Sequence, residues 1–263
     1  MSESHSQSQP LEELEVNNTY ITILGTAHVS KASADAVAEL VHSGKFDIVA
    51  IELCDNRHQS IINPNSLADM DLFEVIKSKK ASMVAASLAL GAYQQRLAEQ
   101  FGIQPGEEMR VAMRLTQEQD LELALIDRDV GVTLRRVYKS IPWWRKLYVI
   151  SGLIASVLSN EKVSEEEIEK LKSGDMLEST FSQFADSAYD LFHPLIAERD
   201  LYMAAKLSRL TEKNQGKNIL AVVGAGHLAG IKEKLTNGID QPQNKIDELE
   251  TLPKGRSYAK IIP

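Results

Sequence analysis

Two segments near opposite ends of the chain place a histidine three positions after a glycine. These are Gly25 with His28, and Gly224 with His227. A short apolar run precedes each glycine and is bounded by polar residues, a pattern typical of a buried strand. Ligands of open α/β sheets bind at the carboxyl ends of strands. If the two strands are neighbours, both imidazoles face one site, where they could hold a metal ion or perform acid–base chemistry.

Charged residues follow two other predicted strands. Glu52 ends one of them among apolar neighbours, and Asp127 and Arg128 come directly after the other. An unpaired buried carboxylate is costly, so Glu52 is either functional, or the first exposed position of its strand, or paired with Arg57. Together with the two histidines, these residues place an imidazole or a charged group at the end of each of four predicted strands. This coincidence favours a functional site.

The residue types at these strand ends match known ligands of divalent cations. His28, His227 and Glu52 would form a ligand set for zinc, iron, cobalt or manganese. A water molecule on such an ion becomes a nucleophile near neutral pH. The metal-free alternative uses one histidine as a general base, oriented by Glu52.

Two arginines on predicted helices are further candidates. Arg199 interrupts an apolar stripe between Glu198 and Asp200, and a guanidinium there needs a carboxylate of the site or a bound anion as partner. A salt bridge between helices explains it equally well. Arg110 begins a helix after two acidic residues, and its alternative is a solvated face.

The predicted elements describe an α/β fold. We expect a mostly parallel sheet flanked by helices, with a single domain over 17–263, a disordered leader over 1–16 and a large helical insertion at about 131–190. The predicted strands are 20–25, 47–53, 121–126, 218–223 and 258–262, and the predicted helices include 30–43, 67–79, 80–101, 107–118 and one from 227. Residues 20–53 are predicted to form a right-handed β-α-β unit.

Composition limits the cellular context. The net charge of −8 argues against a large nucleic-acid interface. The single cysteine, Cys54, excludes an internal disulfide and suits the reducing cytoplasm.

The apolar segment Leu147–Leu158 bears on membrane association. It is too short to span a bilayer, which needs about 20 residues. The preceding Trp143–Lys146 is typical of an interfacial helix, which leaves a peripheral membrane role open. The alternative is a buried helix of the insertion.

Six segments, in order along residues 20–235, resemble the TraB/PrgY family, which is named for proteins that shut down peptide sex-pheromone activity. They are Gly25–Ser30, Val49–Arg57, Gly106–Arg110, Ile126–Asp129, Glu198–Asp200 and Gly224–His227. The resemblance implies an erythromycin-esterase/Tiki-like fold, in a superfamily that includes the Tiki metalloproteases. It also implies that His28, Glu52 and His227 form the centre of the site.

The expected function is metal-dependent hydrolysis of a peptide or another amide or ester bond. His28, His227, Glu52 and Glu198 would hold Mn²⁺, Co²⁺ or Zn²⁺; Glu52, Arg110 and Arg199 would be catalytic; Arg57, Asp127, Arg128 and Asp200 would bind substrate. The alternative is a non-catalytic protein that sequesters a peptide or small ligand. Apolar faces on the insertion would favour a homodimer.

Overall fold

The computed structural model describes residues 9–26, 31–63, 106–142 and 189–253. Its strands are β1 (Leu11–Val16), β2 (Thr19–Thr26), β3 (Ile48–Ile51), β4 (Glu122–Leu125) and β5 (Asn218–Gly224). Its helices are α1 (Lys31–His42), α2 (Asp55–Ile62), α5 (Glu107–Glu118), α6 (Val130–Ser140), α10 (Tyr189–Phe192), the π-helix η2 (His193–Ala197), α11 (Glu198–Lys213), α12 (Ala225–Asn237) and α13 (Pro242–Glu250).

The five strands form one mixed, mostly parallel sheet in the order β1-β2-β5-β3-β4. Among the strands of the described residues, only the pairing of β1 with β2 is antiparallel. The predicted α/β class is therefore confirmed. The predicted β-α-β unit is present with its strands parallel, but β5 lies between β2 and β3.

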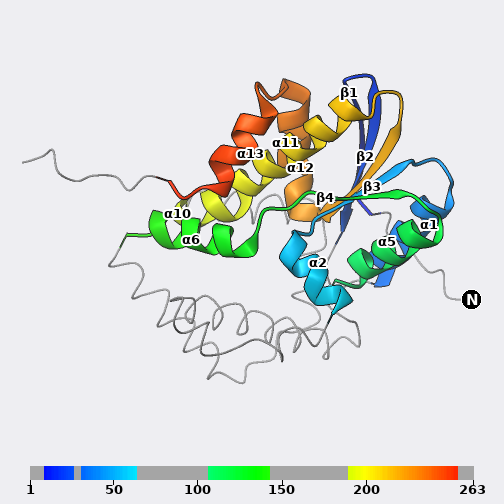
Figure 1. Ribbon diagram of the computed structural model, residues 1–263, viewed down its shortest axis with the longest axis horizontal. Helices are drawn as coiled ribbons and strands as arrows, with labels where there is room; N and C mark the ends of the chain where they lie inside the picture. The colour runs from blue at the N-terminus through cyan, green and yellow to red at the C-terminus, as the bar shows by residue number, and fades with distance from the viewer. Residues whose placement is uncertain (1–8, 27–30, 64–105, 143–188, 254–263) are drawn as a thin grey trace, which may run out of the picture.

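Helices cover both faces of the sheet because side chains of the central strands alternate between two apolar layers. On one face, Ile48 and Ala50 of β3 pack with residues of α11 and α12. On the other, Val49 and Ile51 pack with residues of α1 and α5. Figure 1 shows α11, α12 and α13 on one side of the sheet and α1 and α5 on the other.

The sheet reverses its winding around β5. The helix after β2 lies on one face and the helix after β5 lies on the opposite face, although these two strands are neighbours. Such a reversal separates the following helices at the carboxyl ends of the strands, which is where doubly wound folds bind ligands. The register pairs Thr26 with Gly224, so the two glycine–histidine segments begin side by side.

The predicted leader is wrong for residues 11–16. Leu11–Val16 forms β1, paired along its whole length with β2. Three glutamates in six residues lower the hydropathy of this segment, as is common for edge strands. Oε2 of one of them, Glu12, accepts a hydrogen bond from Nζ of Lys232 in α12 at 2.7 Å.

Several predictions fall outside the described residues. They concern the helices at 67–79 and 80–101, the strand at 258–262, most of the insertion, and the Trp143–Leu158 segment. Within the four described ranges, no helix is long and apolar enough to cross a membrane.

Candidate functional site

Glu52 lies at the carboxyl end of β3, one residue beyond the strand. Alternation along β3 directs it to the same face as Ile48 and Ala50, toward α11 and α12. Its side chain is 3% exposed. The amide of Gly224 donates to its Oε2 at 2.6 Å, so the end of the neighbouring strand fixes the carboxylate.

Arg199, from the first turn of α11, lies between two carboxylates. Its Nε and Nη2 donate to the two oxygens of Asp127, each at 2.9 Å. Its Nη2 also contacts Oε1 of Glu52. Burial alone would lower the pKa of Arg199, but Asp127 and Glu52 raise it above its ordinary value. The guanidinium therefore stays charged and compensates these carboxylates.

His227, from the first turn of α12, lies between Arg199 and Asp200. Its Nδ1 is 2.5 Å from Oδ1 of Asp200, and its Nε2 is 3.0 Å from Nη1 of Arg199. An ionised carboxylate can only accept and a guanidinium can only donate. Hence the proton of His227 is on Nδ1, and the lone pair of Nε2 faces the centre of the site.

We call Glu52, Asp127, Arg199, Asp200 and His227 the Arg199 cluster. It contains three carboxylates and one guanidinium, and four of its five side chains are less than 10% exposed. Burial is the largest influence on Asp200, and it raises the pKa of this carboxyl in spite of its contact with His227. A buried cluster with this excess of negative groups favours the entry of protons or cations.

The cluster unites residues that the sequence predicts for three different roles. Glu52, Arg199 and His227 were expected to act in catalysis or metal binding, and Asp127 and Asp200 in substrate binding. Among the described residues, no group of three or more His, Cys, Asp or Glu side chains is arranged to hold a metal ion. Instead, the guanidinium of Arg199 contacts Glu52, Asp127 and the imidazole of His227, and Asp200 contacts this imidazole directly. The other predicted histidine, His28, lies outside the described residues.

Glu198 belongs to a second buried cluster. Its Oε2 accepts from Nη1 of Arg128 at 2.7 Å and from Nε of Arg136 at 2.6 Å, while its Oε1 accepts from Nη2 of Arg136 at 2.7 Å. Burial alone would raise the pKa of Glu198. The two arginines lower this pKa by more than burial raises it, so the net shift is downward. We call these residues the Glu198 cluster. Both carboxylate oxygens of Glu198 are thus engaged by arginines.

The Glu198 cluster joins three parts of the chain. Arg128 also donates to the carbonyls of Pro194 in η2, at 2.8 Å, and of Leu249 in α13, at 3.4 Å. Arg136 donates to the carbonyl of Thr251 beyond α13. Burial lowers the pKa of Arg128 despite its contact with Glu198. The cluster thus fastens the end of α13 next to the first turn of α11, where the Arg199 cluster begins.

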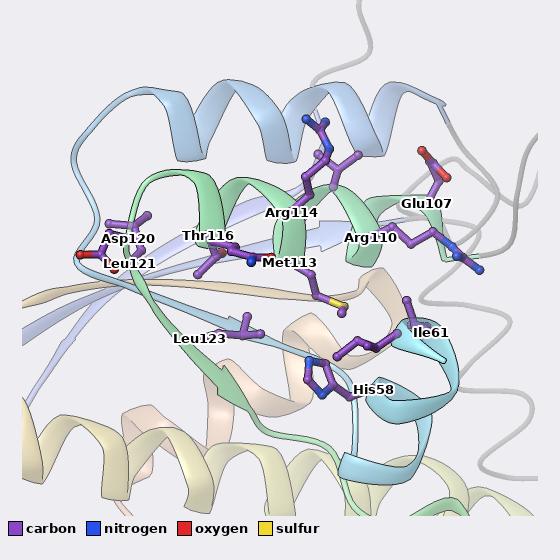
Figure 2. A pocket seen from close by; sticks show the side chains of 13 residues that line it. His58, Ile61, Glu107, Arg110, Met113, Arg114, Thr116, Asp120, Leu121 and Leu123 are labelled. Atoms are coloured by element: carbon purple, nitrogen blue, oxygen red, sulfur yellow. The ribbon is translucent and has the colours of Figure 1, made fainter. Parts of the chain in front are cut away.

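The two remaining predicted arginines lie elsewhere. Arg57 is exposed on α2. Arg110 lines a groove of about 680 Å³ formed by α2, α5 and the segment leading into β4. Figure 2 shows Met113 of α5 extending toward His58 and Ile61 of α2 across this groove. The buried Nε of Arg110 has no hydrogen-bond partner among the described residues.

Two functional features were missed from the sequence. The first is Arg136, which the sequence analysis does not name. Arg136 is buried in α6, and a buried guanidinium needs a partner. Gly230 was also missed: a Cβ at this position would lie 2.1 Å from Oδ2 of Asp200. No local pattern shows either contact, because the partners lie on other elements.

This fold and cluster can be compared with known proteins. A sequence model of the TraB/PrgY/gumN family matches residues 11–238. The chain is 33% identical over 255 residues to an uncharacterized protein of Methanocaldococcus jannaschii, with 94% of this chain and 61% of the relative covered.

Animal proteins are similar as well. The chain is 25% identical over 255 residues to a TraB domain-containing protein of Homo sapiens, covering 89% of this chain and 66% of the relative. It is 24% identical over 263 residues to a TraB domain-containing protein of Bos taurus, covering 92% of this chain and 68% of the relative. The chain thus spans about two thirds or less of the length of these relatives. It belongs to the TraB/PrgY/gumN family, as its sequence motifs indicate.

Proposed function

We propose that this protein is a metal-dependent hydrolase that cleaves amide or ester bonds, with peptides as the first substrates to test. One observation carries the proposal: Nε2 of His227 and Oε1 of Glu52 lie 3.5 Å apart at the carboxyl ends of two neighbouring strands. Ligand atoms of a tetrahedral site with bonds of about 2.1 Å are about 3.4 Å apart. The spacing of these donors therefore fits a shared divalent ion.

The surroundings of both donors support the same proposal. Asp200 holds Nδ1 of His227, which is the usual carboxylate–histidine arrangement behind a metal-binding imidazole. Gly224 holds the other oxygen of Glu52. By sequence, His28 follows Thr26, the last residue of β2, by two positions, so it is the candidate for the third ligand.

The roles of the residues follow from their chemistry. A bound divalent ion would supply a Lewis acid and would acidify a water molecule. Glu52 is either a ligand or the base that takes a proton from this water, since its carboxylate only accepts hydrogen bonds. Arg199 would donate to negative charge that develops on the substrate oxygen. Asp127 would orient Arg199 through its two-oxygen contact.

Metal binding is the first test. Metal-free protein is titrated calorimetrically with Zn²⁺, Mn²⁺ and Co²⁺, and the variants His227→Ala, His28→Ala and Glu52→Gln are compared with wild type. Each variant is expected to bind at least about tenfold more weakly. The control is His42→Ala, since His42 is exposed on α1 and its Nδ1 meets the carbonyl of Ala38.

Turnover is the second test. A library of peptides and model esters is incubated with metal-loaded protein and analysed by mass spectrometry. Metal-dependent cleavage that disappears in Glu52→Gln is expected. Unchanged metal affinity in His227→Ala and Glu52→Gln would overturn the metal centre, and a tightly bound peptide recovered intact would instead favour sequestration.

A further inference from the structure

The strand β4 forms one edge of the sheet, and no other strand of the described residues pairs with its outer side. The amides of Glu122 and Ile126 donate to carbonyl oxygens at or next to the ends of β3, at 3.3 and 3.1 Å. Backbone groups alternate between the two edges of a strand, so Leu123 and Leu125 direct their N–H and C=O groups away from β3. The outer edge of β4 therefore offers a row of donors and acceptors that another extended backbone can satisfy.

The groove that contains Arg110 lies beside this edge, and we call it the α2–α5 groove. Apolar side chains of three elements line it, among them Leu123 of β4, Met113 of α5 and Ile61 of α2. Figure 2 shows Leu123 and Met113 pointing into the space between β4 and α5. A segment paired with β4 directs every second side chain to this face of the sheet. The groove thus fits a segment with apolar residues at alternate positions.

Arg110 adds a charge at one end of the α2–α5 groove. Residues 119–121 connect α5 to β4, so the first turn of α5, with Arg110, lies toward the carboxyl end of β4. The buried Nε of Arg110 has no hydrogen-bond partner among the described residues. In Figure 2, Glu107 points in a different direction from Arg110, and Asp120 lies at the opposite end of the groove. A guanidinium in this position favours a carboxylate of the bound segment.

We propose that the α2–α5 groove and the outer edge of β4 form a docking site for an extended peptide segment. This segment has apolar residues at alternate positions and an acidic residue at the end next to Arg110. Pairing with the backbone of β4 supplies affinity, and the groove and Arg110 supply specificity. The groove lies on the α5 face of the sheet, opposite α11 and α12. Docking therefore goes beyond the proposed hydrolysis and uses no residue of the Arg199 cluster.

Backbone pairing is tested with wild-type protein. The probes are two fluorescein-labelled hexapeptides in which valine and threonine alternate, with a single aspartate at either end to cover both strand directions. Binding is measured by fluorescence anisotropy, and each peptide amide is then N-methylated in turn. The affinity is expected to fall at least about fivefold at every second position and less at the positions between, because only alternate amides face β4. N-methylation that acts equally at all positions would contradict the pairing.

The charge contact is tested with Arg110→Gln, with folding checked by circular dichroism. This variant is expected to bind the aspartate peptide about tenfold more weakly than wild type does. A peptide with asparagine in place of the aspartate should bind both proteins alike. The control is Arg135→Gln, since Arg135 is exposed on α6 and its Nε donates to the carbonyl of Gly131 at 3.0 Å. It should bind the aspartate peptide like wild type.

Amide hydrogen exchange of wild type locates the bound peptide and needs no variant. The amides of Leu123 and Leu125 are expected to exchange at least about tenfold more slowly in its presence. Failure of both hexapeptides to bind, or unchanged exchange at both leucines, would overturn the proposal. Competition by octanoate alone would make the groove a pocket for small amphipathic ligands, and slow exchange caused by dimerisation would assign the edge to a second copy of the chain. Either result would also contradict peptide docking.

Discussion

Asp200 reaches His227 only because a neighbouring helix has no side chain in its path. Oδ1 of Asp200 is 2.5 Å from Nδ1 of His227, while its Oδ2 lies where the Cβ of residue 230 would be. Gly230 lies one helical turn after His227 on α12. The orientation of the imidazole thus depends on a glycine that makes no polar contact of its own.

Gly230→Ala should destabilise the protein although alanine favours helices. Helix propensity would contribute about 1 kcal/mol of stability, but a Cβ at 2.1 Å from Oδ2 of Asp200 forces a displacement that costs about 1–3 kcal/mol. Denaturant unfolding measures the difference, and the NMR signal of the His227 Nδ1 proton should be lost. In an Asp200→Ala background the same change should become stabilising, because the obstructing carboxylate is gone. A stabilising effect in the wild-type background would contradict the contact.

Glu198→Gln should destabilise the fold by about 3–5 kcal/mol near neutral pH, since it leaves Arg128 buried without its anionic partner. The pKa of Glu198 is below its ordinary value of 4.5 in the folded protein. Its stabilising contribution is therefore present above about pH 4.5 and is lost as the pH falls through the lower folded-state pKa. Urea unfolding at several pH values should show the two proteins converging in acid.

The control for this series is Glu39→Gln, since Glu39 is exposed on α1. It should match wild type at each pH. A constant difference between wild type and Glu198→Gln across the acid range would show that the ion pairs do not stabilise the fold.

Tyr202→Phe should loosen the attachment of α13. The hydroxyl of Tyr202 donates to Oε1 of Glu250 at 2.8 Å, and the loss of this bond should cost about 1–2 kcal/mol. Burial and Glu250 raise the pKa of Tyr202 above its ordinary value of 10.0. The contribution is thus present below about pH 10 and is lost as the pH rises further. Faster amide hydrogen exchange in α13 should accompany the change, and unchanged exchange would argue against this attachment.

Asp129→Ala should cost about 1 kcal/mol, the usual value for the loss of a helix N-cap. Oδ1 of Asp129 accepts from the amide of Val132 at 3.0 Å, and Oδ2 accepts from Nδ2 of Asn56 at 2.5 Å. Asn56→Ala removes the second bond and keeps the cap, so it should cost less. Thermal unfolding of both variants measures this, and equal losses would assign the effect to the contact with α2 instead.

Much of the fold was accessible from periodicity. The runs that form β2, β3, β4 and β5 are apolar and bounded by turn residues. The sequence left open whether the two strands with the glycine–histidine pattern are neighbours, and the structure pairs β2 with β5. β1 escaped detection because its glutamates conceal the alternation that buries Leu14 and Val16 against the core.

The site was accessible as a set of residues but not as a set of contacts. The positions of Glu52 and His227 at strand ends predicted that they meet. Local sequence cannot separate the role of Glu198 from that of Arg199, because adjacent residues of a helix point in different directions and their partners are remote in the chain. Only the packing of α11 against both neighbours assigns Glu198 to one cluster and Arg199 to the other.

Glu198, Arg199 and Asp200 are consecutive, and each meets a different partner: the two arginines of α6 and its preceding loop, the carboxylates at the ends of β3 and β4, and the imidazole of α12. Insertion or deletion of one residue between Pro194 and Glu198 would rotate the rest of α11 by about 100° relative to those partners. All three contacts would then be lost together. The length of this stretch is therefore as strictly constrained as its composition, and the five-residue π-helix before Glu198 sets the angle at which α11 enters the site.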